Sequence, residues 1–518
     1  MKTLRSYVQG HWHEAESGFV PLHNPCTEEP IAQASSQGID FGAVYSHARD
    51  KGGPALRELT FEQRGALLAA MSKALFEKRD ELIELSRLNT GVTRKDAKFD
   101  LDGATYTLSY YAKLGRELGD RRWYSEDEGA QLGRSPRFWG RHLRLPLRGV
   151  AVHVNAFNFP AWGLAEKAAC AILAGLPVIS KPATSSAWVT ERCAEILVEA
   201  GILPDGVFSL ICGATGDLLD RLGEQDVFAF TGSADTARRL RGKANLLAAN
   251  TRVNIEADSL NAAVLAPGLA RDGETWAVFL QDVAREITQK SGQKCTAVRR
   301  IFVPRDELDE VQAALCERLS PTVVGDPRDS DVTMGPLATA SQLKDAVEGV
   351  KKLSGGAAIV YGDGQRVDGR GAQPGKGWFF APTLLRTDDE TRAGEVHGHE
   401  VFAPVSTLCG YAGDLSAAGA GVARARGTLV TSLYVDRPES LSAYLAAAGS
   451  TSGRLYVGSE KVAPQLPGSG TTLPAMLHGG PGRAGGGQEL GGLSGLGLYQ
   501  QRVAVTGDRA LLDRAGAD

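Results

Sequence analysis

One cysteine in this sequence has neighbours suited to covalent chemistry. Cys295 lies in Ser291-Gly292-Gln293-Lys294-Cys295-Thr296, between a helix-like segment and a strand-like run that begins at Arg300. A thiolate is a strong nucleophile, and a nearby cation such as Lys294 would favour the ionised form. The alternative is that Cys295, like most cysteines of globular proteins, is a small buried apolar residue. Alone, the motif indicates a nucleophile only weakly.

Two further polar residues stand at the ends of predicted strands. Asn158 lies in Asn155-Ala156-Phe157-Asn158-Phe159-Pro160, just after the β-branched run 150–154. Ligands of parallel sheets bind beyond the carboxyl ends of the strands, so its amide could donate to a developing oxyanion. Glu256 ends the strand 252–255, where burial should raise its pKa toward that of a useful general base. The alternatives are a turn asparagine and an ordinary strand-terminal glutamate.

The segments that must position these residues alternate between strand and helix. From about 148, predicted strands at 150–154, 177–180, 207–211, 227–230 and 252–255 are separated by helical patterns such as 162–173 and 187–200. Crossovers between parallel strands need a helix, so this order predicts a doubly wound parallel sheet. The first 120 residues predict mostly helix, with Thr60 and Gln63 as a capping box and Gly91 as a stop signal.

Composition excludes several other classes of protein. The 518 residues carry a formal net charge of -4, which gives no electrostatic reason to expect nucleic acid or a membrane surface as a partner. Seven scattered cysteines without a CxxC pair predict neither a disulfide framework nor a zinc site, and we expect no bound metal. Residues 1–7 lack a signal-peptide pattern, and no run approaches the roughly 20 apolar residues of a membrane span. We therefore expect a cytoplasmic location.

Considered together, the order and spacing of the motifs resemble the aldehyde dehydrogenase superfamily over essentially the whole chain. Besides the segments around Asn158, Glu256 and Cys295, the resemblance is carried by Ile179-Ser180-Lys181-Pro182-Ala183, Phe230-Thr231-Gly232-Ser233 and Glu400-Val401-Phe402-Ala403-Pro404. It implies an α/β fold in three parts. These are a doubly wound Rossmann-like cofactor domain (1–125 and 148–257), an α/β catalytic domain (258–470), and a small β oligomerisation arm (126–147 and 485–507).

The resemblance also implies a role for each candidate residue. Cys295 is expected to be the nucleophile that adds to the aldehyde carbon. Asn158, with the backbone N–H of Cys295, is expected to form the oxyanion hole, and Glu256 to activate the water that hydrolyses the thioester. From adjacency in the sequence, the residues expected along the aldehyde tunnel are Phe157, Phe159, Lys294 and Thr296.

For a dinucleotide cofactor, Lys181 matches the residue that binds the adenosine ribose. Gly232 and Ser233 begin the predicted helix 234–241, whose N-terminal amides suit a pyrophosphate. Glu400 and Phe402 match the pair that positions the nicotinamide ribose and ring. Many NAD-preferring members have a glutamate three residues after the lysine, where this chain has Thr184 followed by Ser185. Hydroxyls can donate to a 2′-phosphate that a carboxylate would repel, so we expect NADP rather than NAD.

The segment 478–490, His-Gly-Gly-Pro-Gly-Arg-Ala-Gly-Gly-Gly-Gln-Glu-Leu, narrows the expected substrate. It resembles members that oxidise CoA-linked semialdehydes in the aerobic breakdown of benzoate, and also the dehydrogenase part of the ring-opening protein of phenylacetate breakdown. A general aliphatic or aromatic aldehyde dehydrogenase is the alternative. The segments 126–147 and 498–505 pair between subunits in this family, so we expect a homodimer, with a tetramer as the alternative.

Three other functions compete with this interpretation. An acylating dehydrogenase, which passes the acyl group to free CoA, would need no general base, and Glu256 speaks against it. A catalytically silent binding protein would have lost Cys295, Glu256 or Asn158, and all three are present. A cysteine esterase would need a histidine base, and the sequence indicates none beside Cys295.

Overall fold

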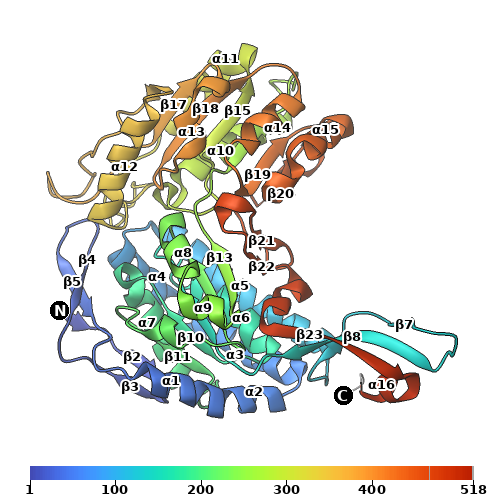
Figure 1. The fold of residues 1–518 in the computed structure, drawn as a ribbon. Helices are drawn as coiled ribbons and strands as arrows, with labels where there is room; N and C mark the ends of the chain where they lie inside the picture. The colour runs from blue at the N-terminus through green and yellow to red at the C-terminus, as the bar shows by residue number, and fades with distance from the viewer. Residues whose placement is uncertain (466, 516–518) are drawn as a thin grey trace.

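The computed structural model describes residues 1–465 and 467–515, which form an α/β structure around two separate seven-stranded sheets (Figure 1). One sheet lies in the lower half of the view and the other in the upper half, and an arm extends to one side. Within the described part of the chain, none of the helices combines the length and apolar composition that a bilayer crossing needs.

The first sheet has the strand order β13-β12-β9-β10-β11-β2-β3. Its parallel strands are β9 (Ala151–Val154), β10 (Val178–Lys181), β11 (Phe208–Leu210), β12 (Val227–Thr231) and β13 (Arg252–Glu256). The order reverses between β9 and β12, and such a switch point opens a crevice at the carboxyl ends of the strands. The doubly wound sheet is therefore confirmed. Asn158, Lys181 and Glu256 all stand at this carboxyl edge.

Helices cover both faces of this sheet because its strands are apolar on both sides. On one face, α6 (Trp162–Ala174) packs with α5 (Arg94–Leu118), which in turn packs on α3 (Phe61–Glu77). On that side α7 (Ala187–Glu199) also contacts α4 (Arg79–Thr90). The other face is covered by α1 (Phe41–His47) and α8 (Ala234–Arg241). The predicted capping box of Thr60 and Gln63 opens α3, and Gly91 ends α4 at φ 69°.

The prediction of mostly helix in the first 120 residues holds from Phe41 to Leu118, but the first 34 residues depart from it. Five short strands precede the first helix: β1 (Lys2–Thr3), β2 (Ser6–Val8), β3 (His11–His13), β4 (Val20–His23) and β5 (Pro30–Ala34). β2 pairs with the distant β11, while β1, β5 and β4 form a sheet of their own. Strands this short carry little periodicity, and the partner that stabilises β2 lies far along the chain.

The second sheet has the order β16-β17-β18-β15-β14-β19-β20 and is parallel except at β16. Its strands are β14 (Ala262–Leu265), β15 (Arg300–Pro304), β16 (Ala358–Tyr361), β17 (Thr383–Thr387), β18 (Val405–Tyr411), β19 (Thr428–Tyr434) and β20 (Ser452–Gly458). One face packs on α10 (Glu274–Thr288) and α11 (Leu308–Leu319). The other packs on α12 (Ala340–Leu353), α14 (Leu415–Ala423) and α15 (Pro438–Ala448).

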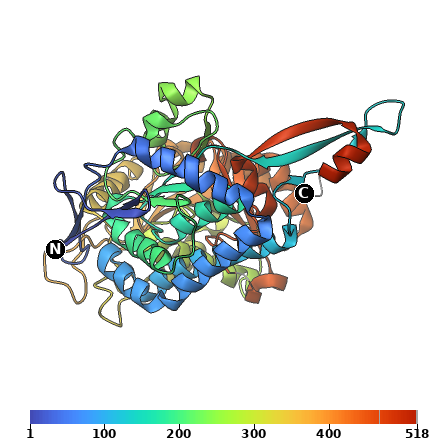
Figure 2. The ribbon, with the colours of Figure 1, turned by 90° about the horizontal axis from the view of Figure 1, so that it is seen from below.

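The arm is a small antiparallel sheet that leaves the body of the molecule (Figure 2). β8 (Phe138–Pro146) pairs along its whole length with β23 (Gln500–Asp508), and β6 (Tyr124–Ser125) and β7 (Ala130–Gln131) complete it. The terminal helix α16 (Arg509–Ala515) lies beside this pair. Parts of the two segments expected to pair between subunits, 126–147 and 498–505, thus also pair with each other within one chain.

Candidate active site

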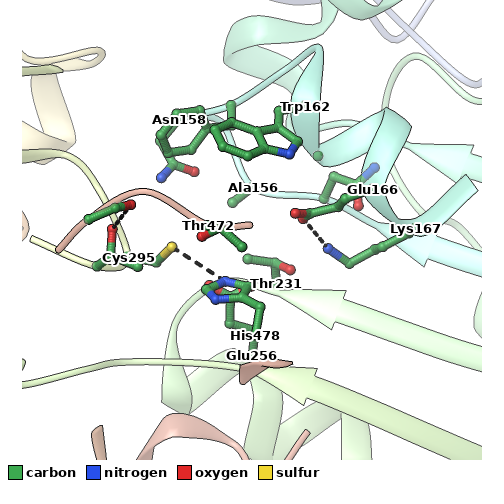
Figure 3. A pocket seen from close by; sticks show the side chains of 15 residues that line it. Ala156, Asn158, Trp162, Glu166, Lys167, Thr231, Glu256, Cys295, Thr472 and His478 are labelled. Atoms are coloured by element: carbon green, nitrogen blue, oxygen red, sulfur yellow. Dashed lines mark hydrogen bonds and ion pairs between the residues drawn. The ribbon is translucent and has the colours of Figure 1, made fainter. Parts of the chain in front are cut away.

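A small cavity of about 40 Å³ lies between the two sheets and brings the three candidate catalytic residues together (Figure 3). Asn158, Glu256 and Cys295 all line it, although they come from different elements. Asn158 follows β9, Glu256 ends β13, and Cys295 lies in the connection between α10 and β15. The close-up shows the Asn158 amide and the Cys295 thiol on facing sides of the space. A reacting carbonyl between them would meet both a nucleophile and a hydrogen-bond donor.

The Cys295 segment is fixed mainly through its backbone. Nδ2 of Asn261 donates to the Cys295 carbonyl at 2.7 Å and to the Ala297 carbonyl at 2.9 Å. The buried guanidinium of Arg299 donates to the carbonyls of Gly292 and Lys294 at 2.9 and 3.2 Å. Because these bonds need no atom of the thiol, Sγ stays available to the cavity. Cys295 is accordingly one of the two cysteines that are not fully buried.

Asn158 is held by the start of helix α6. The carboxylate of Asp100, on α5, accepts hydrogen bonds from the backbone N–H of Trp162 at 2.9 Å and of Ala161 at 3.3 Å. This caps α6 with a side chain from a neighbouring helix. Thr190 adds a bond to the carbonyl of Pro160 at 3.0 Å. The loop from β9 to α6 is therefore anchored on its far side, which orients Asn158.

A glycine-rich segment packs directly on the strand that carries Glu256. The N–H of Gly487 donates to the carbonyl of Ile255 at 3.0 Å, and the Gln488 N–H donates to the side chain of Asn254 at 2.8 Å. A Cβ at position 487 would lie 2.3 Å from the Ile255 oxygen, so a larger residue would force the segment away. The segment belongs to a hairpin of β21 (Leu477–Gly479) and β22 (Gln488–Leu490).

That hairpin delivers a residue that the sequence did not indicate. His478, on β21, places Nε2 3.2 Å from Oε1 of Glu256 and 3.9 Å from Sγ of Cys295. The expectation that no histidine stands beside Cys295 is therefore wrong. His478 is the first residue of the segment 478–490, but nothing in the sequence shows that this segment folds back onto β13.

His478 also reverses a predicted pKa shift. Burial does raise the pKa of Glu256, as predicted, but the charge of His478 and then of Lys167 lowers it more, so the net shift is downward. Burial lowers the pKa of His478, and the nearby Glu256 charge more than offsets this and leaves it raised. Burial, followed by the charge of Glu256, raises the pKa of the Cys295 thiol. The resting site therefore favours a carboxylate, an imidazolium and a protonated thiol.

The four residues expected along an aldehyde tunnel divide into two pairs. Phe159 and Thr296 line the cavity. Phe157 instead packs edge-on against Phe402, with ring centroids 5.9 Å apart. Lys294 points away from the cavity and is fully buried, with Nζ 2.7 Å from Oε2 of Glu286. Its charge is already neutralised, so the prediction that Lys294 supports the thiolate is also corrected.

Three charged residues of the same site were not singled out from the sequence. Nζ of Lys167 lies 2.9 Å from Glu166 and 3.1 Å from Glu489, and Glu166 and Lys167 line the cavity. Burial lowers the pKa of Lys167, but the surrounding carboxylates outweigh it and the net shift is upward. Charged side chains line the cavity opposite the thiol (Figure 3). Each looks like an ordinary helix or loop residue in the sequence.

The predicted ribose-binding residues lie at the carboxyl edge of the first sheet. Lys181 ends β10, burial lowers its pKa, and among the described residues no carboxylate forms an ion pair with it. Thr184 and Ser185 begin a short 3-10 helix and line a second cavity of about 560 Å³. Glu28 lies in the same wall. A partly buried cation without a carboxylate partner, three residues before the cavity-lining Thr184, fits a polar, anionic cofactor.

The other predicted cofactor residues are partly engaged within the protein. Ser233 caps α8, as expected, by accepting from the N–H of Thr236 at 3.3 Å, while Gly232 precedes it. The N–H of Ala234 donates to Asp258 at 2.8 Å, so one amide of the predicted pyrophosphate site is occupied. The Glu400 carboxylate accepts from the Ser259 N–H at 3.1 Å and lies 3.4 Å from Arg299.

Burial raises the pKa of Glu400 to about 7, although the adjacent Arg299 charge lowers it. The Arg299 guanidinium also lies 5.3 Å from the ring centroid of Phe402. Glu400, Arg299 and Phe402 thus form one connected group just behind the Cys295 segment.

Comparison with known proteins identifies the class. Residues 12–443 match the aldehyde dehydrogenase family, and the chain belongs to that family. It is therefore an NAD(P)-dependent oxidoreductase that acts on aldehydes. A similar curated protein is 3,4-dehydroadipyl-CoA semialdehyde dehydrogenase of Aromatoleum evansii, which is 42% identical over 478 residues, covering 92% of this chain and 93% of that protein.

Solved structures show the same fold. Lactaldehyde dehydrogenase from Escherichia coli superposes with a TM-score of 0.83 at 22% identity, over 97% of this chain and 99% of that one. Betaine aldehyde dehydrogenase from Staphylococcus aureus, in complex with NAD+, superposes with a TM-score of 0.82 at 23% identity. The match covers 98% of this chain and 95% of that one. The aldehyde dehydrogenase fold predicted from the motifs is confirmed.

Proposed function

We propose that this enzyme oxidises a CoA-linked semialdehyde, 3,4-dehydroadipyl-CoA semialdehyde or a close analogue, to the carboxylic acid in benzoate degradation. The observation that carries the proposal is the 42% identity to the Aromatoleum enzyme over nearly the full length of both chains. The cavity at the thiol, about 40 Å³, holds only the aldehyde end in this proposal, and the CoA part lies outside it.

The residues around the cavity supply a complete sequence of steps. The Cys295 thiol releases its proton to solvent water, and Sγ then adds to the aldehyde carbon and forms a hemithioacetal. The Asn158 amide and the Cys295 N–H donate to the oxyanion. The dinucleotide, when bound, supplies a hydride acceptor, and a thioester remains on Cys295. Glu256 then takes a proton from water, whose oxygen attacks the thioester carbon and releases the acid and the thiolate.

The cofactor in this proposal is NADP. Lys181 would hold the adenosine ribose, Thr184 and Ser185 would donate to a 2′-phosphate, and Glu400 and Phe402 would position the nicotinamide ribose and ring. Glu28 is a carboxylate residue in the same cavity wall and would oppose a 2′-phosphate. A tenfold preference for NAD in kcat/KM would contradict this assignment, and Glu28→Gln should shift the ratio further toward NADP.

The decisive assay follows absorbance at 340 nm with NADP and a CoA-linked semialdehyde. Wild type should reduce the cofactor and Cys295→Ala should not. The kcat/KM for the CoA-linked substrate should exceed that for simple aliphatic aldehydes, and equal values would refute the proposed substrate. Comparison with the ring-opened semialdehyde of phenylacetate breakdown distinguishes the two CoA-linked candidates. A requirement for free CoA would instead indicate an acylating dehydrogenase.

We also propose that the enzyme is a cytoplasmic homodimer in which the arm pairs between subunits. β8 and β23 pair with each other along their length and project from the body. Among the described strands β23 is at the edge of this sheet, so its outer side has hydrogen-bonding groups available to a second copy. Light scattering at micromolar concentration should give the mass of a dimer. A monomer would contradict the proposal.

A further inference from the structure

We propose that Glu256, Cys295 and His478 form a binding site for one Zn²⁺ ion, and that the ion reversibly blocks the thiol. Metal binding itself depends only on the geometry of these three side chains. The inhibition expected from it rests on the proposed role of Cys295 as the nucleophile.

The three ligand atoms converge at one point of the cavity wall. Sγ of Cys295, Nε2 of His478 and a carboxylate oxygen of Glu256 all lie within 4.8 Å of one another. Nε2 is 3.2 Å from Oε1 of Glu256 and 3.9 Å from Sγ. Ordinary zinc bond lengths in a tetrahedral centre separate nitrogen and oxygen by roughly 3.3 Å and nitrogen and sulfur by roughly 3.6 Å. The nitrogen–oxygen and nitrogen–sulfur separations therefore differ from these values by only a few tenths of an ångström.

The carboxylate oxygen is available to a cation. Oε1 of Glu256 is buried, and His478 is its ion-pair partner. The Glu256 side chain is 3% exposed and that of His478 is 5% exposed. A bound cation would replace the His478 charge as the counterion of this buried carboxylate.

The charge balance favours a dication with a thiolate ligand. On binding, bonds form from Zn²⁺ to Sγ and to Nε2, and two protons are released to solvent, one from the thiol and one from the His478 imidazolium. His478 must bind as the neutral imidazole. A thiolate and a carboxylate then neutralise the two positive charges of the ion, which suits a site removed from water. The cavity leaves a fourth position for a water molecule, as in zinc sites with three protein ligands.

The ligand types indicate zinc rather than magnesium or calcium. Sulfur and imidazole nitrogen suit Zn²⁺, whereas Mg²⁺ and Ca²⁺ prefer oxygen. The absence of a CxxC pair predicted no zinc site because such spacings describe ligands that are close in sequence. Here Cys295 and His478 are 183 residues apart, and only the fold brings them together.

Cobalt(II) provides a probe that does not need turnover. Enzyme freed of metal with EDTA and exchanged into chelator-free buffer is titrated with Co²⁺ and followed by absorbance. Wild type should show a near-ultraviolet thiolate-to-cobalt band together with the visible bands of a four-coordinate site. Cys295→Ser should lose the near-ultraviolet band. His478→Gln should weaken Co²⁺ binding by at least about tenfold, because one of the three protein ligands is removed. His11→Gln, which alters an exposed histidine, should match wild type.

Thiol protection by zinc itself is the second measurement. Zn²⁺ should slow alkylation of Cys295 by iodoacetamide, measured by peptide mass spectrometry, and EDTA should restore the rate. Mg²⁺ at the same concentration should give no protection, and His478→Gln should require at least about tenfold more Zn²⁺ than wild type. Circular dichroism shows whether each variant is folded.

Three results would overturn the site. The first is no cobalt band in wild type, and the second is the same near-ultraviolet band in Cys295→Ser. The third is unchanged metal affinity in folded His478→Gln, which would mean that the thiol binds the metal without the histidine. Loss of the proposed function would look different. In that case the cobalt band and zinc protection would persist while no aldehyde is oxidised.

Discussion

The carboxylate of Glu256 and the imidazole of His478 lie 3.2 Å apart in the wall of the same cavity. The imidazole also lies 3.9 Å from the Cys295 thiol, so one side chain touches both the proposed nucleophile and the proposed base. Glu256 and Cys295 nevertheless have separate tasks in the reaction. Replacing one and retaining the other should therefore stop the reaction at different stages.

Glu256→Gln should separate the two halves of the reaction. The amide keeps the size of the side chain but cannot accept a proton, so water attack on the thioester should slow by roughly 10²–10⁴-fold. Thioester formation needs Cys295 and the cofactor, so it should persist. Rapid mixing should then show a burst at 340 nm of about one reduced cofactor per active site, followed by slow turnover. Intact-protein mass spectrometry should detect the acylated Cys295, and loss of the burst would contradict this division of roles.

The sequence predicted the parts of this site that are local, and the structure adds those that depend on long-range packing. Asn158 and Glu256 could be placed because each follows an apolar strand of an alternating pattern, and strand ends converge at one edge of a parallel sheet. His478 could not, because its position depends on Gly487 packing against the backbone of Ile255.

The predicted direction of the Glu256 pKa shift was wrong for the same reason. Burial could be predicted from the apolar strand, but the charge that outweighs burial comes from His478 on the β21–β22 hairpin. The N-terminal strands were missed because β2 is stabilised by the distant β11. Lys294 looked like a neighbour of the thiol, yet adjacent side chains can point apart, and this one is paired with Glu286.

Asn158→Ala should reduce kcat with little effect on cofactor binding. Removing one oxyanion donor typically lowers kcat by about 10²–10³-fold, or about 3–4 kcal/mol of transition-state stabilisation. Since Asn158 lines the cavity at the thiol, the dissociation constant for NADP should change little. Stopped-flow absorbance with and without the substitution measures the first effect, and fluorescence titration the second. A tenfold loss of cofactor affinity with unchanged kcat would assign Asn158 to the cofactor instead.

Cofactor binding should depend on pH through Glu400, whose pKa burial raises to about 7. The carboxylate is ionised above that pH and becomes neutral as the pH falls through it. An ionised carboxylate is the stronger acceptor for ribose hydroxyls, so affinity should be lost on the acid side. If only the ionised form binds, the dissociation constant should rise by about tenfold between pH 8 and pH 6.

The matched control for this pH effect is Glu400→Gln, which has no ionisable group. Its dissociation constant should vary less between the two pH values than that of wild type, whereas any titration of the cofactor phosphate affects both proteins alike. Fluorescence quenching by NADP at constant ionic strength measures both. Identical pH profiles for the two proteins would show that Glu400 does not titrate in this range.

Lys294 should matter for stability more than for chemistry. Its ammonium is fully buried and lies 2.7 Å from Glu286, whose side chain is 1% exposed. Lys294→Met would leave the Glu286 charge buried without this partner, and breaking such a pair typically costs about 3–5 kcal/mol. Lys294→Met with Glu286→Leu removes both charges and should recover part of that loss. Lys344→Met is the control, since Lys344 and Glu348 form an exposed pair worth roughly 0–1 kcal/mol. Urea unfolding measures all three, and an unchanged midpoint in Lys294→Met would show that the buried pair contributes little.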